Sequence, residues 1–280
     1  MPLCKTKDIL SHATENKFGV LAAVTFNYET IKWAIKAAEI EKMPVIILFY
    51  PGFNFHIPQE FMAHMATALA KDASVPVAVH LDHSASYEVA VSGIRDGFSS
   101  IMVDGSSLSY EENVALTSQV VQTARVFGVD VEAELGVVGS GGNIDHLTNP
   151  DLFTNANEAK EFVERTGCDA LAIAVGNAHG LYVKTPDLDF TRIKAIRKAV
   201  SIPLVMHGSS GIPDEQLQEA VNQGISKYNT GTEYFRAFYD ALKSDEKSSD
   251  SLSLLKNVEE PIIEFLRAKI RLLNPNGCSL

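Results

Sequence analysis

The sequence predicts a single (β/α)8 barrel, the TIM-barrel member of the α/β class. Eight short runs rich in β-branched residues alternate with longer amphipathic stretches, which is the pattern of repeated βαβ units. A chain of 280 residues is long enough for one such barrel. A doubly wound sheet would usually carry G-x-G-x-x-G after its first strand, and no such spacing follows the first run here.

The expected strands and helices alternate along the chain. The β-branched runs predict strands at residues 19–26, 44–49, 76–81, 100–103, 129–135, 170–175, 203–206 and 225–228. Amphipathic periodicity predicts helices at 28–42, 58–73, 86–96, 110–127, 157–166, 190–200 and 213–223, with another from about 232. Helix-start residues support several of these boundaries, such as Pro213 followed by Asp214 and Glu215. Each strand thus has its own helix, as a barrel requires.

Three segments lie outside the eightfold alternation. Residues 6–15 predict an extra helix, which we expect to close the bottom of the barrel. Residues 243–253 are polar and rich in serine, so they are expected to form a mobile connector to a last helix at about 259–273. Because there is no internal repeat and no second core, residues 1–280 are expected to form one domain.

Composition argues against several classes of function. The formal net charge is −11 and no stretch is rich in Lys or Arg, so neither nucleic acid nor an anionic membrane is an expected partner. The chain also lacks an apolar signal segment and any apolar run of about 18 residues. Cys4, Cys168 and Cys278 have no C-x-x-C spacing and are odd in number, which favours reduced thiols in the cytoplasm.

Three histidines stand at corresponding places after predicted strands. His83, His179 and His207 follow the third, sixth and seventh strands, and the C-terminal strand ends of a parallel barrel carry its reacting groups. Three imidazoles with an open fourth position suit a catalytic Zn²⁺. One histidine at a strand end would be ordinary polar loop filling, but three at one level favour the metal.

Two glycine-bearing loops follow the seventh and eighth predicted strands. They are HGSSG at 207–211 and NTGT at 229–232. In barrels this region commonly binds phosphate through backbone N–H groups and a helix N-terminus, and glycine lets the backbone approach the anion. Each loop alone would be an ordinary turn, but their position favours a phosphate site to which the hydroxyls of Ser210 and Thr232 can donate.

Together these residues resemble the class II, metal-dependent aldolases that cleave fructose or tagatose 1,6-bisphosphate. The resemblance runs from about Lys17 to the last helix. It is carried by AVTFNYET (23–30), VAVHLDHS (77–84), IMVDGSSLSYEEN (101–113), VEAELG (131–136), VGNAHGLY (175–182), LDF (188–190), PLVMHGSSGI (203–212) and KYNTGTE (227–233).

The resemblance implies a role for each matching residue. His83, His179 and His207 would hold zinc, and Asp104 and Glu134 would offer the metal, or a second ion, an alternative site. The C1 phosphate of dihydroxyacetone phosphate would be bound, with Na⁺ or K⁺ nearby, by Gly180, Gly208, Ser210, Asn229 and Thr232. A homodimer or homotetramer is the expected assembly.

Asp82 is the implied acid/base that acts on the C4 hydroxyl. Cleavage of the C3–C4 bond requires a base for this proton, and a carboxylate beside a metal ligand supplies one. The alternative is that Asp82 only orients a histidine.

Three positions depart from the family pattern. Gly142 stands where a mobile loop usually carries a carboxylate, so Asp145 or His146 is a candidate substitute. Tyr50 ends the second strand where a small hydroxyl residue usually helps to hold the far end of the sugar. Gly231 stands where an acidic or small residue is common, and Lys184 is a candidate contact for a distal anion.

The leading hypothesis is therefore a zinc-dependent aldolase of carbohydrate metabolism. It would release dihydroxyacetone phosphate from a ketose 1-phosphate, either a 1,6-bisphosphate or an analogue with a 6-sulfonate, a carboxylate or a plain hydroxymethyl group. A barrel metallohydrolase and a catalytically silent relative that binds zinc and phosphate remain as alternatives.

Overall fold

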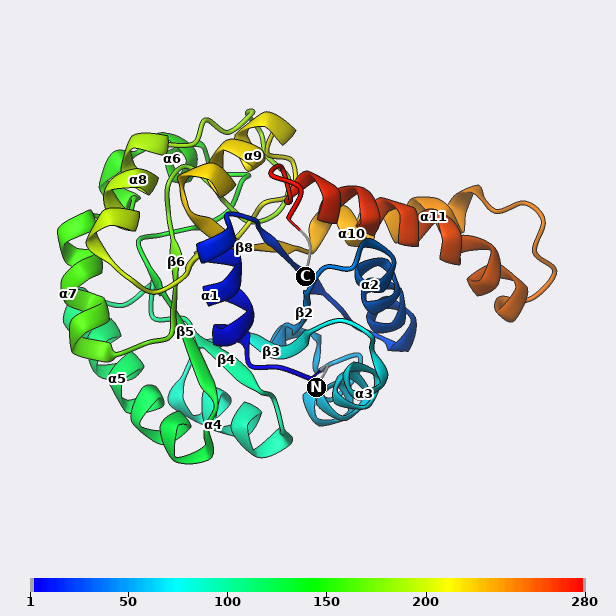
Figure 1. Cartoon of the computed structure of the whole chain (residues 1–280), viewed down its shortest axis with the longest axis horizontal. Helices are drawn as coiled ribbons and strands as arrows, with labels where there is room; N and C mark the ends of the chain where they lie inside the picture. The colour runs from blue at the N-terminus through cyan, green and yellow to red at the C-terminus, as the bar shows by residue number, and fades with distance from the viewer. Residues whose placement is uncertain (1–2, 279–280) are drawn as a thin grey trace.

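The computed structural model describes residues 3–278 and contains a closed barrel of eight parallel strands (Figure 1). Consecutive strands are neighbours, and β1 also pairs with β8, which closes the sheet. The predicted fold class is thereby confirmed. The strands are β1 (Val20–Val24), β2 (Val45–Phe49), β3 (Val77–Ser84), β4 (Ser100–Val103), β5 (Asp130–Leu135), β6 (Ala170–Ile173), β7 (Leu204–Met206) and β8 (Ile225–Thr230).

Helices surround this barrel. Three begin with capping boxes, in which the side chains of Asn27, Ser109 and Asp250 accept hydrogen bonds from backbone N–H groups of the first turn. The helices are α1 (Thr6–Asn16), α2 (Tyr28–Glu41), α3 (Gln59–Asp72), α4 (Tyr87–Asp96), α5 (Tyr110–Phe127), α6 (Ile144–Thr148), α7 (Ala156–Thr166), α8 (Phe190–Ala199), α9 (Asp214–Gln223), α10 (Thr232–Ser244) and α11 (Ser251–Leu272), with short 3-10 turns η1 (Pro51–Phe53) and η2 (Pro150–Leu152).

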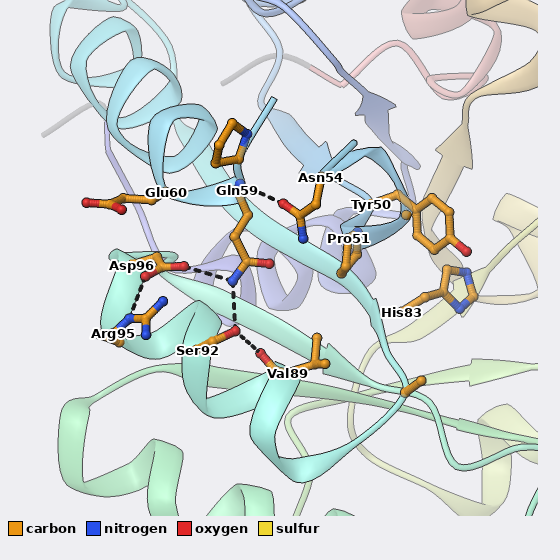
Figure 2. A pocket seen from close by; sticks show the side chains of 13 residues that line it. Tyr50, Pro51, Asn54, Gln59, Glu60, His83, Val89, Ser92, Arg95 and Asp96 are labelled. Atoms are coloured by element: carbon orange, nitrogen blue, oxygen red, sulfur yellow. Dashed lines mark hydrogen bonds and ion pairs between the residues drawn. The ribbon is translucent and has the colours of Figure 1, made fainter. Parts of the chain in front are cut away.

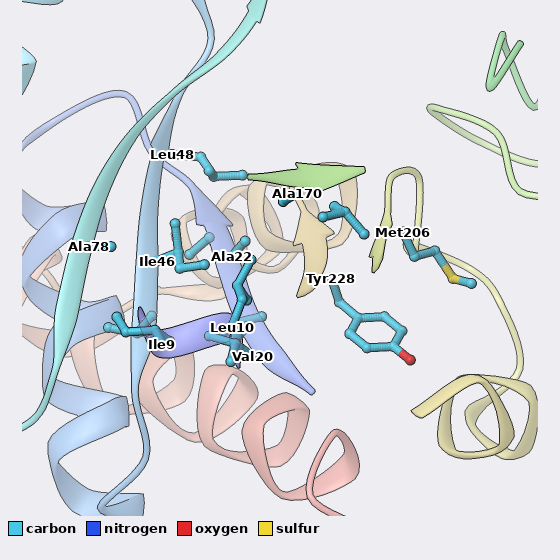
Figure 3. Packing of buried hydrophobic residues seen from close by; sticks show 14 of the residues in the cluster. Ile9, Leu10, Val20, Ala22, Ile46, Leu48, Ala78, Ala170, Met206 and Tyr228 are labelled. Atoms are coloured by element: carbon cyan, nitrogen blue, oxygen red, sulfur yellow. The ribbon is translucent and has the colours of Figure 1, made fainter. Parts of the chain in front are cut away.

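The extra N-terminal helix α1 lies across the barrel where the strands begin, as predicted (Figure 1). It buries Ile9 and Leu10 in the same core as Val20 of β1 (Figure 3). The hydroxyl groups of Thr6 and Ser100 lie 2.5 Å apart, which fixes the helix to the start of β4. The opposite end of the barrel is therefore the open end, and it carries the candidate site.

The C-terminal extension differs from the expected boundaries. The connector spans residues 245–250 rather than 243–253, and α11 begins at Ser251 rather than near Glu259 (Figure 1). The Asp250 carboxylate causes the early start, because it accepts hydrogen bonds from the N–H groups of Leu252 and Ser253. Pro261 is tolerated inside the helix, although proline is favoured in a first turn and removes one helical hydrogen bond.

Two strands run further than predicted, and one helix was missed. After an irregularity in register, Ser84 of β3 pairs with Val103, so Asp82 and His83 lie within the strand rather than after it. Likewise β8 continues through Asn229 to Thr230. Helix α6 was not expected, and it begins where the Asn143 side chain accepts a hydrogen bond from the N–H of Asp145.

No helix within residues 3–278 is long and apolar enough to cross a membrane.

Candidate active site

Three imidazole rings from different strand ends meet at the open end of the barrel. Nδ1 of His207 lies 3.0 Å from Nε2 of His83 and 3.4 Å from Nε2 of His179. The three ring nitrogens come from β3 and from the loops that follow β6 and β7. They face a common point, which is the arrangement that the strand-end positions predicted.

The outer nitrogen of each ring has its own hydrogen-bond acceptor. Nδ1 of His83 lies 2.8 Å from Oδ2 of Asp104, and Nδ1 of His179 lies 3.1 Å from the carbonyl oxygen of Gly139. Nε2 of His207 lies 2.9 Å from Oε1 of Glu132. An outer N–H that donates to each acceptor leaves the inner nitrogen with a free lone pair. Three inward lone pairs make this cluster fit a metal such as Zn²⁺.

A buried carboxylate lies beside the three rings. Oε2 of Glu134 is buried without a hydrogen-bond partner among the described residues, and it lies 4.0 Å from Nδ1 of His207. Burial raises the pKa of Glu134 to about 8, and the nearby carboxylate of Asp104 adds to the shift. Together with His83 and Asp104, Glu134 forms a second group of potential ligands. A partnerless carboxylate oxygen in this place also fits a bound cation.

The charges around His83 favour its cationic form when no metal is bound. Burial alone would lower the pKa of His83, but the carboxylates of Asp82, Asp104 and Glu134 outweigh it and raise this pKa to about 9. Burial would likewise raise the pKa of Asp104, yet hydrogen bonds from His83 and Ser106 hold it well below its usual range. The pocket therefore supplies the negative potential that a divalent cation needs.

Asp82 lies between the histidines and the eighth strand. The residue is 4% exposed, and its two carboxylate oxygens accept hydrogen bonds of 3.2 and 3.3 Å from Nδ2 of Asn229. Oδ2 of Asp82 lies 4.0 Å from Nε2 of His83. Asp82 thus lines one cavity together with His83 and His179, and Asn229 fixes its position.

This cavity has a volume of about 700 Å³, and the glycine-bearing loops form another of its walls. Its lining includes all five residues expected to bind the phosphate, namely Gly180, Gly208, Ser210, Asn229 and Thr232. Gly208 has φ 63°, and a Cβ there would overlap the carbonyl oxygen of Ala178. The N-terminus of α10 follows Gly231, and the N–H of Glu233 donates to the Ser210 hydroxyl. The two loops therefore expose backbone and hydroxyl groups on one side of the histidines.

Of the residues proposed for specificity, only Tyr50 lines the cavity. Its ring stands edge-on to that of His83, with 6.1 Å between the ring centres. His146 is turned back on its own loop, where Nδ1 accepts a hydrogen bond from the N–H of Ser140. Asp145 is exposed on α6, and Lys184 is exposed in the loop after β6. The structure does not bring these three residues to the cavity.

A buried ion pair below the histidines was missed by sequence reasoning. Nζ of Lys227 lies 2.7 Å from Oε2 of Glu132, and both side chains are buried inside the barrel. Glu132 thus joins Lys227 of β8 to His207. His80, Asp82 and Glu132 form a third group of potential ligands, but Lys227 already supplies a cation there. A lysine in the middle of a predicted barrel strand was the signal that could have revealed this pair.

Comparisons with known proteins identify the family of this chain. The family model described as fructose-bisphosphate aldolase class-II matches residues 4–278. The chain is 39% identical over 265 residues to the Escherichia coli K12 protein named uncharacterized protein YdjI, covering 95% of each chain. The crystal structure of the YdjI aldolase from that organism superposes with a TM-score of 0.87 at 36% identity over 97% of both chains.

A more distant solved structure gives the same result. The fructose-bisphosphate aldolase (Fba) of Campylobacter jejuni superposes with a TM-score of 0.82 at 25% identity, over 97% of this chain and 95% of the other. The family model, the sequence relative and both solved structures span nearly the whole chain. The protein therefore belongs to the class II fructose-bisphosphate aldolase family.

Proposed function

We propose that this protein is a zinc-dependent aldolase that reversibly cleaves a ketose 1-phosphate into dihydroxyacetone phosphate and an aldehyde. The convergence of His83, His179 and His207, each with its outer nitrogen bound to an acceptor, carries the proposal. Asp82 and the glycine-bearing loops line the same cavity. When bound to the three histidines, zinc would act as a Lewis acid that stabilises negative charge on substrate oxygens.

Asp82 is assigned as the base for the bond cleavage. Its carboxylate removes the proton of the C4 hydroxyl, C4 becomes the aldehyde carbon, and the electron pair of the C3–C4 bond passes to C3 and the C2 oxygen. The amide of Asn229 fixes the carboxylate through both of its oxygens. Because Asp145 and His146 do not line the cavity, solvent water is assigned as the source of the proton that C3 takes up.

The C1 phosphate is assigned to the two glycine-bearing loops and to Gly180 in the loop after β6. Gly180 and Gly208 have positive φ angles, so the backbone approaches the cavity without a side chain in the way. The hydroxyl groups of Ser210 and Thr232 and the start of α10 add polar groups that suit an anion. A monovalent cation beside this phosphate, a homo-oligomeric assembly and a cytoplasmic location are further parts of the proposal.

A coupled assay for dihydroxyacetone phosphate release tests the function. Zinc-loaded protein is mixed with fructose 1,6-bisphosphate, tagatose 1,6-bisphosphate and ketose 1-phosphates altered at C6. Release is expected from at least one of them and is expected to stop when a chelator removes zinc.

An Asp82→Asn variant separates the base from metal binding. It should retain zinc and lose about 10²–10⁴-fold in kcat. Full activity of this variant would contradict the role of Asp82. Release of inorganic phosphate would instead indicate a metallohydrolase, and zinc binding without cleavage of any sugar would indicate the silent relative that Gly142 and Tyr50 leave open.

A further inference from the structure

A second cavity of about 580 Å³ adjoins the catalytic cavity and lies between helices α3 and α4 (Figure 2). The two cavities share Tyr50, His83 and Ala85 in their walls. A substrate held at the three histidines can therefore extend past the Tyr50 ring into this space, which we call the α3–α4 groove. Its volume is within the range of small-molecule sites, about 300–1,000 Å³.

Two amide side chains give the groove neutral hydrogen-bonding groups. Nε2 of Gln59 donates to Oγ of Ser92 and to Oδ2 of Asp96, at 2.8 Å in both cases, and its oxygen is turned the other way (Figure 2). Oδ1 of Asn54 accepts the N–H of Gln59. Within residues 3–278, neither Oε1 of Gln59 nor Nδ2 of Asn54 has a hydrogen-bond partner, although Gln59 is only 8% exposed. One free acceptor and one free donor thus line the same groove.

The charges of the groove do not favour a second anionic group on the substrate. Among the residues that line the groove, Arg95 is the one with a lysine or arginine side chain. Its Nε lies 2.8 Å from Oδ1 of Asp96. Asp96 is buried, and Glu60 adds another carboxylate to the lining. Two carboxylates against one paired guanidinium give a net negative charge to the part of the groove away from His83 (Figure 2). A phosphate binds best to unpaired cations, and the one arginine of this lining is already paired with Asp96.

We infer that the α3–α4 groove binds the distal end of an uncharged polyhydroxylated aldehyde. This inference rests on the proposed aldolase function and adds the substrate class of its aldehyde half. A hydroxyl group both donates and accepts, so it satisfies the free Gln59 oxygen and the free Asn54 amide nitrogen. The preferred ketose 1-phosphate then carries neutral hydroxymethylene groups beyond C4 rather than a 6-phosphate.

The condensation reaction tests this inference with the intact protein. Zinc-loaded enzyme receives dihydroxyacetone phosphate together with glycolaldehyde, glyceraldehyde, threose, glyceraldehyde 3-phosphate or an aldehyde that ends in a carboxylate. A bond forms between C3 of dihydroxyacetone phosphate and the aldehyde carbon, C3 loses a proton, and the aldehyde oxygen gains one. We expect kcat/KM to rise with the length of the neutral aldehydes, while the phosphate and the carboxylate confer no advantage.

Variants of the groove separate its role from that of the catalytic cavity. Val89 lines only the groove, so Val89→Trp fills it and Val89→Ala serves as the matched control. Val89→Trp is expected to lower kcat/KM for threose about tenfold, as loss of one or two hydrogen bonds would, and to leave glycolaldehyde unchanged. Asn54→Leu, which is similar in size, should give a loss of about threefold to tenfold for threose alone. Thermal unfolding checks that each variant folds.

The outcomes distinguish a failure of this inference from a failure of the proposed function. A preference for glyceraldehyde 3-phosphate or for the carboxylate-ended aldehyde would overturn the inference and leave the aldolase function standing. Equal effects of Val89→Trp on threose and glycolaldehyde would do the same. If no aldehyde condenses with dihydroxyacetone phosphate, the proposed function fails and the inference fails with it.

Discussion

Replacing Lys227 with methionine is expected to lower the free energy of unfolding by about 3–5 kcal/mol, the usual cost of leaving one partner of a buried ion pair without the other. The ammonium group lies 2.7 Å from Oε2 of Glu132 inside the barrel. Methionine fills a similar space without charge, so the Glu132 carboxylate loses its cation. It keeps the 2.9 Å hydrogen bond to His207 and lies 4.0 Å from Nε2 of His80. Urea unfolding of the zinc-free protein measures this loss.

The same substitution is expected to weaken zinc binding. Glu132 accepts the hydrogen bond that orients the imidazole of His207, and Lys227 holds Glu132 in place. Loss of a partner that orients a metal ligand typically lowers metal affinity by about 10–100-fold. Competition with a chromophoric chelator measures this affinity independently of enzyme activity.

Two further variants test the reasoning about Lys227. Lys194→Met, on the exposed face of α8, should change the free energy of unfolding by no more than about 0.5 kcal/mol. Adding Glu132→Gln to Lys227→Met removes the unpaired charge and keeps an oxygen near His207, so most of the lost stability should return. If Lys227→Met alone stays within about 1 kcal/mol of the wild type and binds zinc normally, the ion pair does not have the role assigned to it.

Three other predictions follow from single contacts. Gly208→Ala places a methyl group against the carbonyl oxygen of Ala178 at a φ of 63°, so it should lower the free energy of unfolding by about 1–3 kcal/mol and raise KM for the ketose phosphate. An unchanged KM would count against this loop as the phosphate site. Burial raises the pKa of Cys168 to about 12, so at pH 8 a thiol reagent should label it only after unfolding in urea, which peptide mass spectrometry can establish. Leu10→Ala should destabilise the protein by about 2–5 kcal/mol in urea unfolding, and a much smaller loss would mean that α1 does not seal the core.

Much of the fold could be predicted because its signals are local. Alternation of β-branched runs with amphipathic stretches depends only on neighbouring residues, and the strand-end rule then places His83, His179 and His207 at one end of the barrel. Boundaries were less certain where two local signals compete. Asp250 and Pro261 both suit a helix start, and the structure begins α11 beside Asp250.

The sequence by itself determined the eightfold alternation of strands and helices and the three histidines whose inner ring nitrogens meet at the open end of the barrel. Only the tertiary structure decided what each outer imidazole nitrogen binds, because Asp104, Gly139 and Glu132 are far from their partners in the chain. It also decided that Asp145 and His146 lie away from the cavity and that a groove beside Tyr50 continues it. Such contacts arise when the barrel closes and brings separate strands together, which no local pattern encodes.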